Sequence, residues 1–148
     1  MKEGVNIRAL RDLYIDYDKE LCSLPGMIFD EKRTRSYASG MVLRKDIDWN
    51  LIVKEGEAIG FLIIKANENG YDYYVVDTYV KPEYRNQGIM TSHVLKTFEG
   101  FRGKTIGLTI IQNNYLGMSF WRSIFKKLGY IPEISFGGGF IELKFQME

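Results

Sequence analysis

A strand, a polar turn and a helix follow one another between residues 71 and 98, and this succession constrains the fold most. Residues 71–80 are rich in aromatic and β-branched side chains, which predicts a strand. Apolar residues recur at helical spacing from Ile89 to Phe98, and Gly100 is a typical stop signal. The chain therefore leaves a strand, turns through Gly88 and begins a helix.

The start of this helix predicts an anion site, because unpaired N–H groups and the positive end of the macrodipole meet there. No Asp or Glu occurs between residues 84 and 98 to oppose an anion. The glycine spacing fits neither a dinucleotide-binding fold nor a Walker-type loop. We expect the turn to hold a phosphate group; on the turn alone, a plain helix start is the equal alternative.

Length and composition indicate one globular domain over residues 1–148, with 45% hydrophobic and 26% charged residues. The net charge of +1 gives no general attraction to nucleic acid or anionic membranes, so neither is expected as a partner. Cys22 is the only cysteine, which excludes an intrachain disulfide. No signal-peptide pattern or membrane-length apolar run occurs, so we expect a cytoplasmic protein.

The other elements are predicted from periodicity and turn signals. Helices are expected at residues 6–22 (or a short strand at 5–10), 31–43 after the N-cap Asp30, and from Asn113 or Asn114 to Gly129. Strands are expected at residues 49–53, 58–65, 104–111, 131–136 and 140–145. The strands before and after the central helix should be parallel, because a crossover joins them. The fold class is α+β, a mixed sheet with helices on both faces.

Two stretches resemble the acyl-CoA-binding region of the GNAT family, the GCN5-related N-acetyltransferases. Residues 77–89, with Arg85-x-x-Gly88, are similar to its Gln/Arg-x-x-Gly-x-Gly/Ala motif after a strand. Asn114, Gly117, Phe120-Trp121 and Leu128-Gly129-Tyr130 resemble its Asn, Ala, Phe-Tyr and Leu-Gly-Phe positions. The resemblance implies a central, mostly antiparallel mixed sheet. In it two parallel strands, which are strands 4 and 5 in the family's order, splay apart.

The resemblance also implies acetyl-CoA as co-substrate, with no metal. Its implied contacts are Val80, Arg85, Asn86, Gln87, Gly88, Ile89, Met90, Thr91, Asn114, Gly117 and Trp121. Arg85 either adds charge there or packs against the turn. Met90 stands where the family usually has Gly or Ala. The family often has a Tyr in the later helix that acts as general acid to the leaving thiolate. Here Trp121 or Phe125 stands at that position, which leaves the general acid unassigned.

The implied reaction is direct transfer of acetyl from acetyl-CoA to a primary amine of a small molecule or peptide. Asp77, a carboxylate in an apolar strand, is the expected base; the alternative is a strand-edge Asp in water, or one paired with a helix residue. The Thr78 N–H would polarise the thioester carbonyl. Tyr79 would line the acceptor pocket with Asp77. The alternative is a catalytically inactive acyl-CoA-binding module, and the chain is expected to be a monomer or a homodimer.

Overall fold

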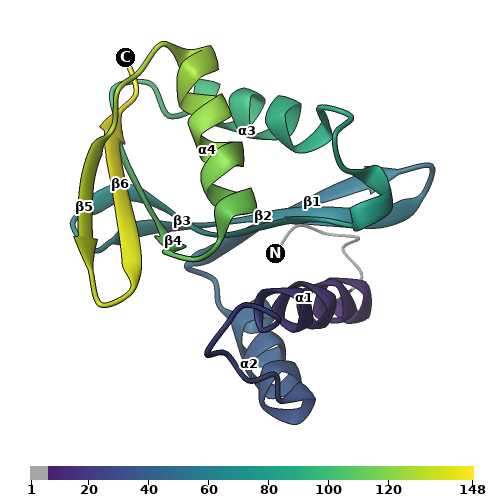
Figure 1. The fold of residues 1–148 in the computed structure, drawn as a ribbon. Coiled ribbons are helices and arrows are strands. Elements are labelled where there is room, and N and C mark those ends of the chain that lie inside the picture. Colours follow the sequence, from purple (N-terminus) through teal and green to yellow (C-terminus); the bar gives the residue numbers. More distant parts are fainter. Residues whose placement is uncertain (1–6) are drawn as a thin grey trace. The chain divides into compact units, whose positions relative to one another are not determined.

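The computed structural model describes residues 7–148, which fold into four α-helices, a short 3₁₀ helix and six strands (Figure 1). The helices are α1 (Ile7–Leu21), α2 (Glu31–Leu43), η1 (Pro82–Tyr84), α3 (Ile89–Glu99) and α4 (Tyr115–Leu128). The strands are β1 (Ile47–Lys54), β2 (Glu57–Glu68), β3 (Tyr71–Val80), β4 (Thr105–Ile111), β5 (Glu133–Gly137) and β6 (Phe140–Gln146). They form one sheet in the order β1-β2-β3-β4-β6-β5.

The capping residues predicted for α2 and α4 are confirmed. The Asp30 side chain accepts a hydrogen bond from the Arg33 N–H at the start of α2. Asn114, rather than Asn113, is the N-cap of α4, and Gly129 ends that helix with a left-handed φ of 74°. Residues 7–10 are helical, so the alternative first strand is wrong there; residues 5 and 6 lie outside the described residues.

The predicted parallel pair is also confirmed. Tyr73 is in register with Ile106, Tyr74 with Gly107 and Val75 with Leu108, and α3 forms the crossover between the two strands. β4 pairs antiparallel with β6, and β6 with β5. The class is therefore mixed α+β, as predicted. Among residues 7–148, no helix combines the length and apolar character needed to cross a membrane.

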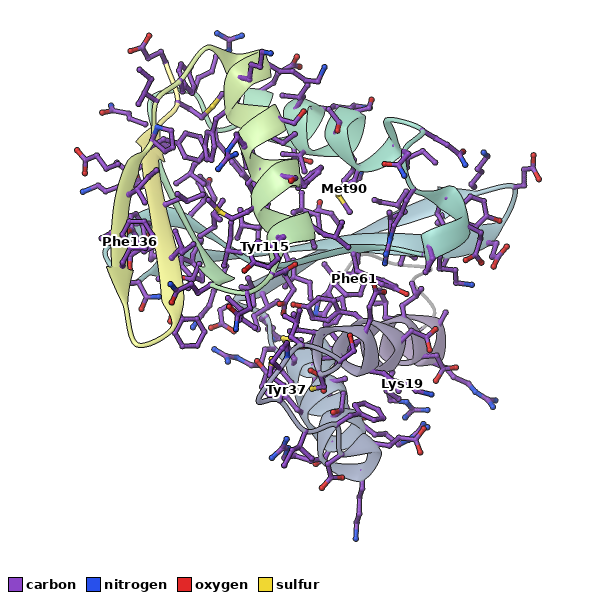
Figure 2. The ribbon with its side chains drawn as sticks, in the orientation of Figure 1. Lys19, Tyr37, Phe61, Met90, Tyr115 and Phe136 are labelled. Atoms are coloured by element: carbon purple, nitrogen blue, oxygen red, sulfur yellow. The ribbon has the colours of Figure 1, made fainter. Side chains whose placement is uncertain are left out.

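The contacts divide the chain into two compact units. Among the described residues, the first unit comprises residues 7–64 and 77–87. Its core forms where α1 packs on α2 and on the strands, with the ring of Tyr14 against Trp49 and Phe61. Figure 2 shows Phe61 on β2, facing α1.

The second unit comprises residues 65–76 and 88–148. Its core forms where α3 and α4 meet the sheet: Phe98 contacts both Trp121 and Phe145, and Phe125 contacts Phe145 edge to face. These rings explain the helical spacing of the apolar residues in both helices. That the whole chain is a single domain remains a prediction.

Candidate functional site

The Asp77 carboxylate lies in the first unit between β3 and the tyrosines of α1. The Tyr17 hydroxyl donates to Oδ1 at 2.5 Å and the Tyr14 hydroxyl donates to Oδ2 at 3.3 Å. Tyr14 and Tyr17 are three residues apart, so they lie on the same face of the helix. Both carboxylate oxygens therefore have a neutral hydroxyl donor.

Burial of the carboxylate raises the pKa of Asp77 from 3.8 to about 7, against the opposing effect of the two tyrosine hydrogen bonds. The negative charge of Asp18 adds to the increase in this pKa. Burial, reinforced by Asp77, holds the pKa of Tyr17 well above its usual value. Tyr17 therefore remains a proton donor, while Asp77 can exchange a proton near neutral pH.

The sequence predicted only that Tyr14 and Tyr17 lie in the first helix, within residues 6–22, and did not identify their hydroxyls as partners of Asp77. A signal was available, because a buried carboxylate needs polar partners and tyrosine combines a ring with a hydroxyl. Tyr79, the predicted acceptor contact, is buried against the rings of Tyr17 and Phe61.

The turn that follows β3 is fixed by side chains of the first unit. The guanidinium of Arg85 binds both carboxylate oxygens of Glu20, at 2.6 and 2.7 Å, and its Nε donates to the Val80 carbonyl at 3.0 Å. The same guanidinium lies 5.6 Å from the centre of the Tyr79 ring. Glu20 carried no sequence signal for this contact. The roles predicted for Val80 and Arg85 stay predictions.

The end of the turn brings the backbone into the left-handed region. Asn86 has φ 60° and Gly88 has φ 75°, and a side chain at Gly88 would be strained by this backbone rather than by any neighbour. Gln87 donates from Nε2 to the Glu83 carbonyl. Thr78, the predicted carbonyl-polarising residue, lies on β3 between Asp77 and Tyr79.

The N-terminus of α3, in the second unit, has the features that an anion site requires. Gly88 is its N-cap and supplies no side-chain hydrogen bond, and its first turn contains no acid. Ile89, Met90 and Thr91 form that turn, so their N–H groups are the ones a helix start leaves without a backbone partner. Met90 itself is buried.

The N-terminus of α4 differs because its own side chain caps it. Asn114 Oδ1 accepts from the Gly117 N–H at 3.0 Å. A Cβ at Gly117 would lie 2.8 Å from the Asn114 side chain, which explains the glycine. Trp121 is buried against Phe98, and Phe125 is also buried. In the second unit, Trp121 is thus a core side chain as well as a predicted cofactor contact.

Several solved structures that are similar to this chain are described as acetyltransferases. One, from Thermus thermophilus, has 12% identity and a TM-score of 0.70, covering 93% of this chain and 88% of that chain. The PaiA N-acetyltransferase from Thermoplasma acidophilum, in complex with coenzyme A, has 17% identity and a TM-score of 0.65, covering 95% and 92%.

A third, from Salmonella typhimurium, modifies the N-terminal serine of ribosomal protein L7/L12; it has 14% identity and a TM-score of 0.65, covering 96% and 90%. At these identities the likeness concerns the fold. No curated protein sequence matches the chain.

The family is given by a match over residues 8–123 to the Acetyltransferase (GNAT) family, which covers well over half of the chain. The chain belongs to the GNAT acetyltransferase family. The predicted family is therefore confirmed, and with it the general class of transferase. The residue roles, the absence of a metal and the cytoplasmic location remain predictions.

Proposed function

We propose that this protein is an acetyl-CoA-dependent N-acetyltransferase that acetylates a primary amine by direct transfer. Asp77 carries the proposal, because its pKa of about 7 suits a base that must take a proton from an amine near neutral pH. The membership of the GNAT family and the coenzyme A complex of the Thermoplasma relative support the choice of acyl donor.

The residues at the start of α3 fit a diphosphate. The helix start has no side-chain cap and no acid in its first turn, whereas the starts of α2 and α4 are each capped by a side chain. The N–H groups of residues 89–91 would bind the diphosphate of coenzyme A. Asn114 and Gly117 would contact the pantetheine arm, as the family resemblance implies.

In the proposed reaction the amine nitrogen attacks the thioester carbonyl, a C–N bond forms and the C–S bond breaks. Asp77 takes the proton of the amine, directly or through water, and Tyr14 and Tyr17 hold its carboxylate in place. The Thr78 N–H stabilises the oxyanion. The thiolate of coenzyme A leaves with a proton from a donor that we do not assign, because Trp121 and Phe125 have none to give to sulfur.

The alternative, a module that binds acyl-CoA without turnover, is favoured by the burial of Trp121 and Phe125 at the helix positions where the family's Tyr is expected. A screen of primary amines, with detection of the free thiol, separates the two functions. Acceptor-dependent thiol release supports the enzyme, and acetyl-CoA binding without release for any amine supports the binding module.

The donor is tested by calorimetric titration with acetyl-CoA. Gly88→Asp should abolish binding, because it places a carboxylate before the helix start and strains the backbone. Gly70→Asp is the matched control, since Gly70 has a similar φ of 82° in the turn between β2 and β3. Absence of binding by the wild-type protein at high micromolar concentration would refute the proposed function.

A further inference from the structure

One face of α1 reaches both the expected base and the turn before α3. Tyr14, Tyr17 and Glu20 recur every three residues, so they share a face that spans about 9 Å along the helix axis. The two tyrosines bind the Asp77 carboxylate, and Glu20 binds Arg85. The first helix therefore fixes two segments of the chain that flank η1.

The contact between Glu20 and Arg85 is bidentate, the geometry in which a guanidinium holds a carboxylate most rigidly. With the bond from Nε to the Val80 carbonyl, three of the five N–H donors of Arg85 are used within the first unit. The charge of Arg85 is balanced by Glu20, so its role need not be to attract an anion.

The opposite side of the turn is attached to β2. Glu57 accepts from the Lys81 ammonium at 2.7 Å and from the Tyr84 hydroxyl at 3.2 Å. The Lys81 N–H donates to the Ile59 carbonyl at 2.8 Å. The turn is thus held from α1 at Arg85 and from β2 at Lys81 and Tyr84, immediately before the backbone enters the left-handed region at Asn86.

We propose that Glu20 is a positioning residue for acetyl-CoA binding, which acts through Arg85 by fixing the conformation of the turn that leads into α3. This inference rests on the proposed function, in which the amides at the start of α3 bind the diphosphate. Glu20 itself contacts no part of the ligand. Its carboxylate holds Arg85, and Arg85 holds the Val80 carbonyl at the end of β3.

The change in acetyl-CoA affinity on removing the charge of Glu20 distinguishes this role from direct binding of the diphosphate by Arg85. If Arg85 bound the diphosphate directly, removing the negative charge of Glu20 would release the guanidinium and leave acetyl-CoA binding unchanged or tighter. If Glu20 fixes the turn, Glu20→Gln disorders the helix entry and weakens binding. We expect the Kd for acetyl-CoA to rise about fivefold, an effect in the range of a well-ordered, partly exposed ion pair.

Calorimetric titration of acetyl-CoA into Glu20→Gln, Arg85→Gln and the double variant tests this. We expect both single variants to bind more weakly and the double variant to be no weaker than the weaker single, because they remove the same contact. Asp12→Asn is the matched control: Asp12 is an exposed acid on the same helix, so this variant makes the same change of charge and should bind as the wild type does.

Arg85→Lys gives a second variant that keeps the positive charge and loses the bidentate geometry. The proposal expects it to bind as weakly as Glu20→Gln, whereas direct diphosphate binding expects a Kd near that of the wild type. Melting curves identify a variant that is unfolded, and Arg85→Lys retains the test if Glu20→Gln does not fold.

Steady-state kinetics distinguish a positioning role from a general loss of structure, because a loss of structure would affect kcat and both acyl donors. Glu20→Gln should raise the KM for acetyl-CoA with little change in kcat, and should leave the KM for S-acetylpantetheine, which lacks the diphosphate, unchanged. Unchanged or tighter acetyl-CoA binding by Glu20→Gln overturns the inference, as does an equal loss with S-acetylpantetheine. If the wild-type protein binds no acetyl-CoA, it is the proposed function that fails.

Discussion

Two aspartates on β3, five residues apart, have opposite electrostatic environments. Asp72 accepts from the Thr105 N–H at 2.8 Å and from the Thr105 hydroxyl at 3.0 Å, and its own N–H donates to that hydroxyl. The N–H of Thr105 holds the pKa of Asp72 below its usual value. Burial raises the pKa of Asp77 to about 7. The same residue type on one strand is ionised at neutral pH at one position and titrates near neutral pH at the other.

The difference shows what decides the role of a carboxylate in this fold. Asp72 joins the start of β3 to the start of β4, next to the register pair of Tyr73 and Ile106, so its charge is compensated by a backbone donor. Within residues 7–148, the side-chain donors to Asp77 are two neutral hydroxyls, and burial outweighs them. A low pKa with a strong donor suits a structural link, and a pKa near 7 suits a base.

The largest expected effect is that of Asp77→Asn, which removes the base and keeps an oxygen for the tyrosine hydroxyls. We expect kcat to fall about 10²- to 10⁴-fold, with the Kd for acetyl-CoA unchanged. Steady-state rates with an amine found in the acceptor screen, together with calorimetric titration, measure both. If Asp77→Asn retained the wild-type kcat, Asp77 would not be the base, and its contrast with Asp72 would have no bearing on catalysis.

The pH dependence of kcat/KM for the amine should show the titration of Asp77. The base must be ionised, so the rate should fall about tenfold for each pH unit below about 7. The amine also titrates, and this dependence remains in Asp77→Asn, whereas the inflection near pH 7 should disappear. An inflection that persists in Asp77→Asn would assign it to another group.

The sequence was sufficient to predict the elements because their signals are local. The strand, the turn ending in Gly88 and the helix that ends at Gly100 were all read from spacing and glycine chemistry. Asp77 was found because an acid in an apolar strand is unusual. The family followed from Arg85, Gly88 and the helix after Asn114, and the match over residues 8–123 confirms it.

The partners of these residues could not be read from the sequence, because they depend on tertiary packing. Tyr14 and Tyr17 fit an apolar helix face equally well with or without Asp77 beneath them. Glu20 is one acid among several on α1, and no spacing connects it with Arg85, which lies 65 residues further along the chain. Local patterns identified Asp77 as the candidate base, whereas the groups that set its pKa required the structure.

A smaller effect is expected for Tyr17→Phe, which removes the shorter of the two hydrogen bonds to Asp77. That bond lowers the pKa of Asp77, so its loss should raise the pKa and shift the inflection of the rate profile upward. At pH 7 we expect a rate about three- to tenfold lower, recovering at higher pH. Tyr14→Phe, at 3.3 Å, should shift the profile less; equal profiles for both variants would contradict the assignment.

The smallest effect on activity, less than about twofold, is expected for Asp72→Asn. This variant should change the stability of the fold and leave the catalytic rate nearly unchanged. The lowered pKa of Asp72 means that its contribution to stability is present above about pH 3.8 and is lost as the pH falls through its folded value.

Asp77 has the opposite sign: its raised pKa favours folding at low pH, and this contribution is lost as the pH rises from about 3.8 through about 7. Melting temperatures at about pH 3, 5 and 8 should therefore show a loss for Asp72→Asn that is similar at the two higher values and shrinks at the lowest. The same measurements should show a relative gain for Asp77→Asn that grows from the lowest pH to the highest. Parallel curves for the two variants would show that the two carboxylates do not differ.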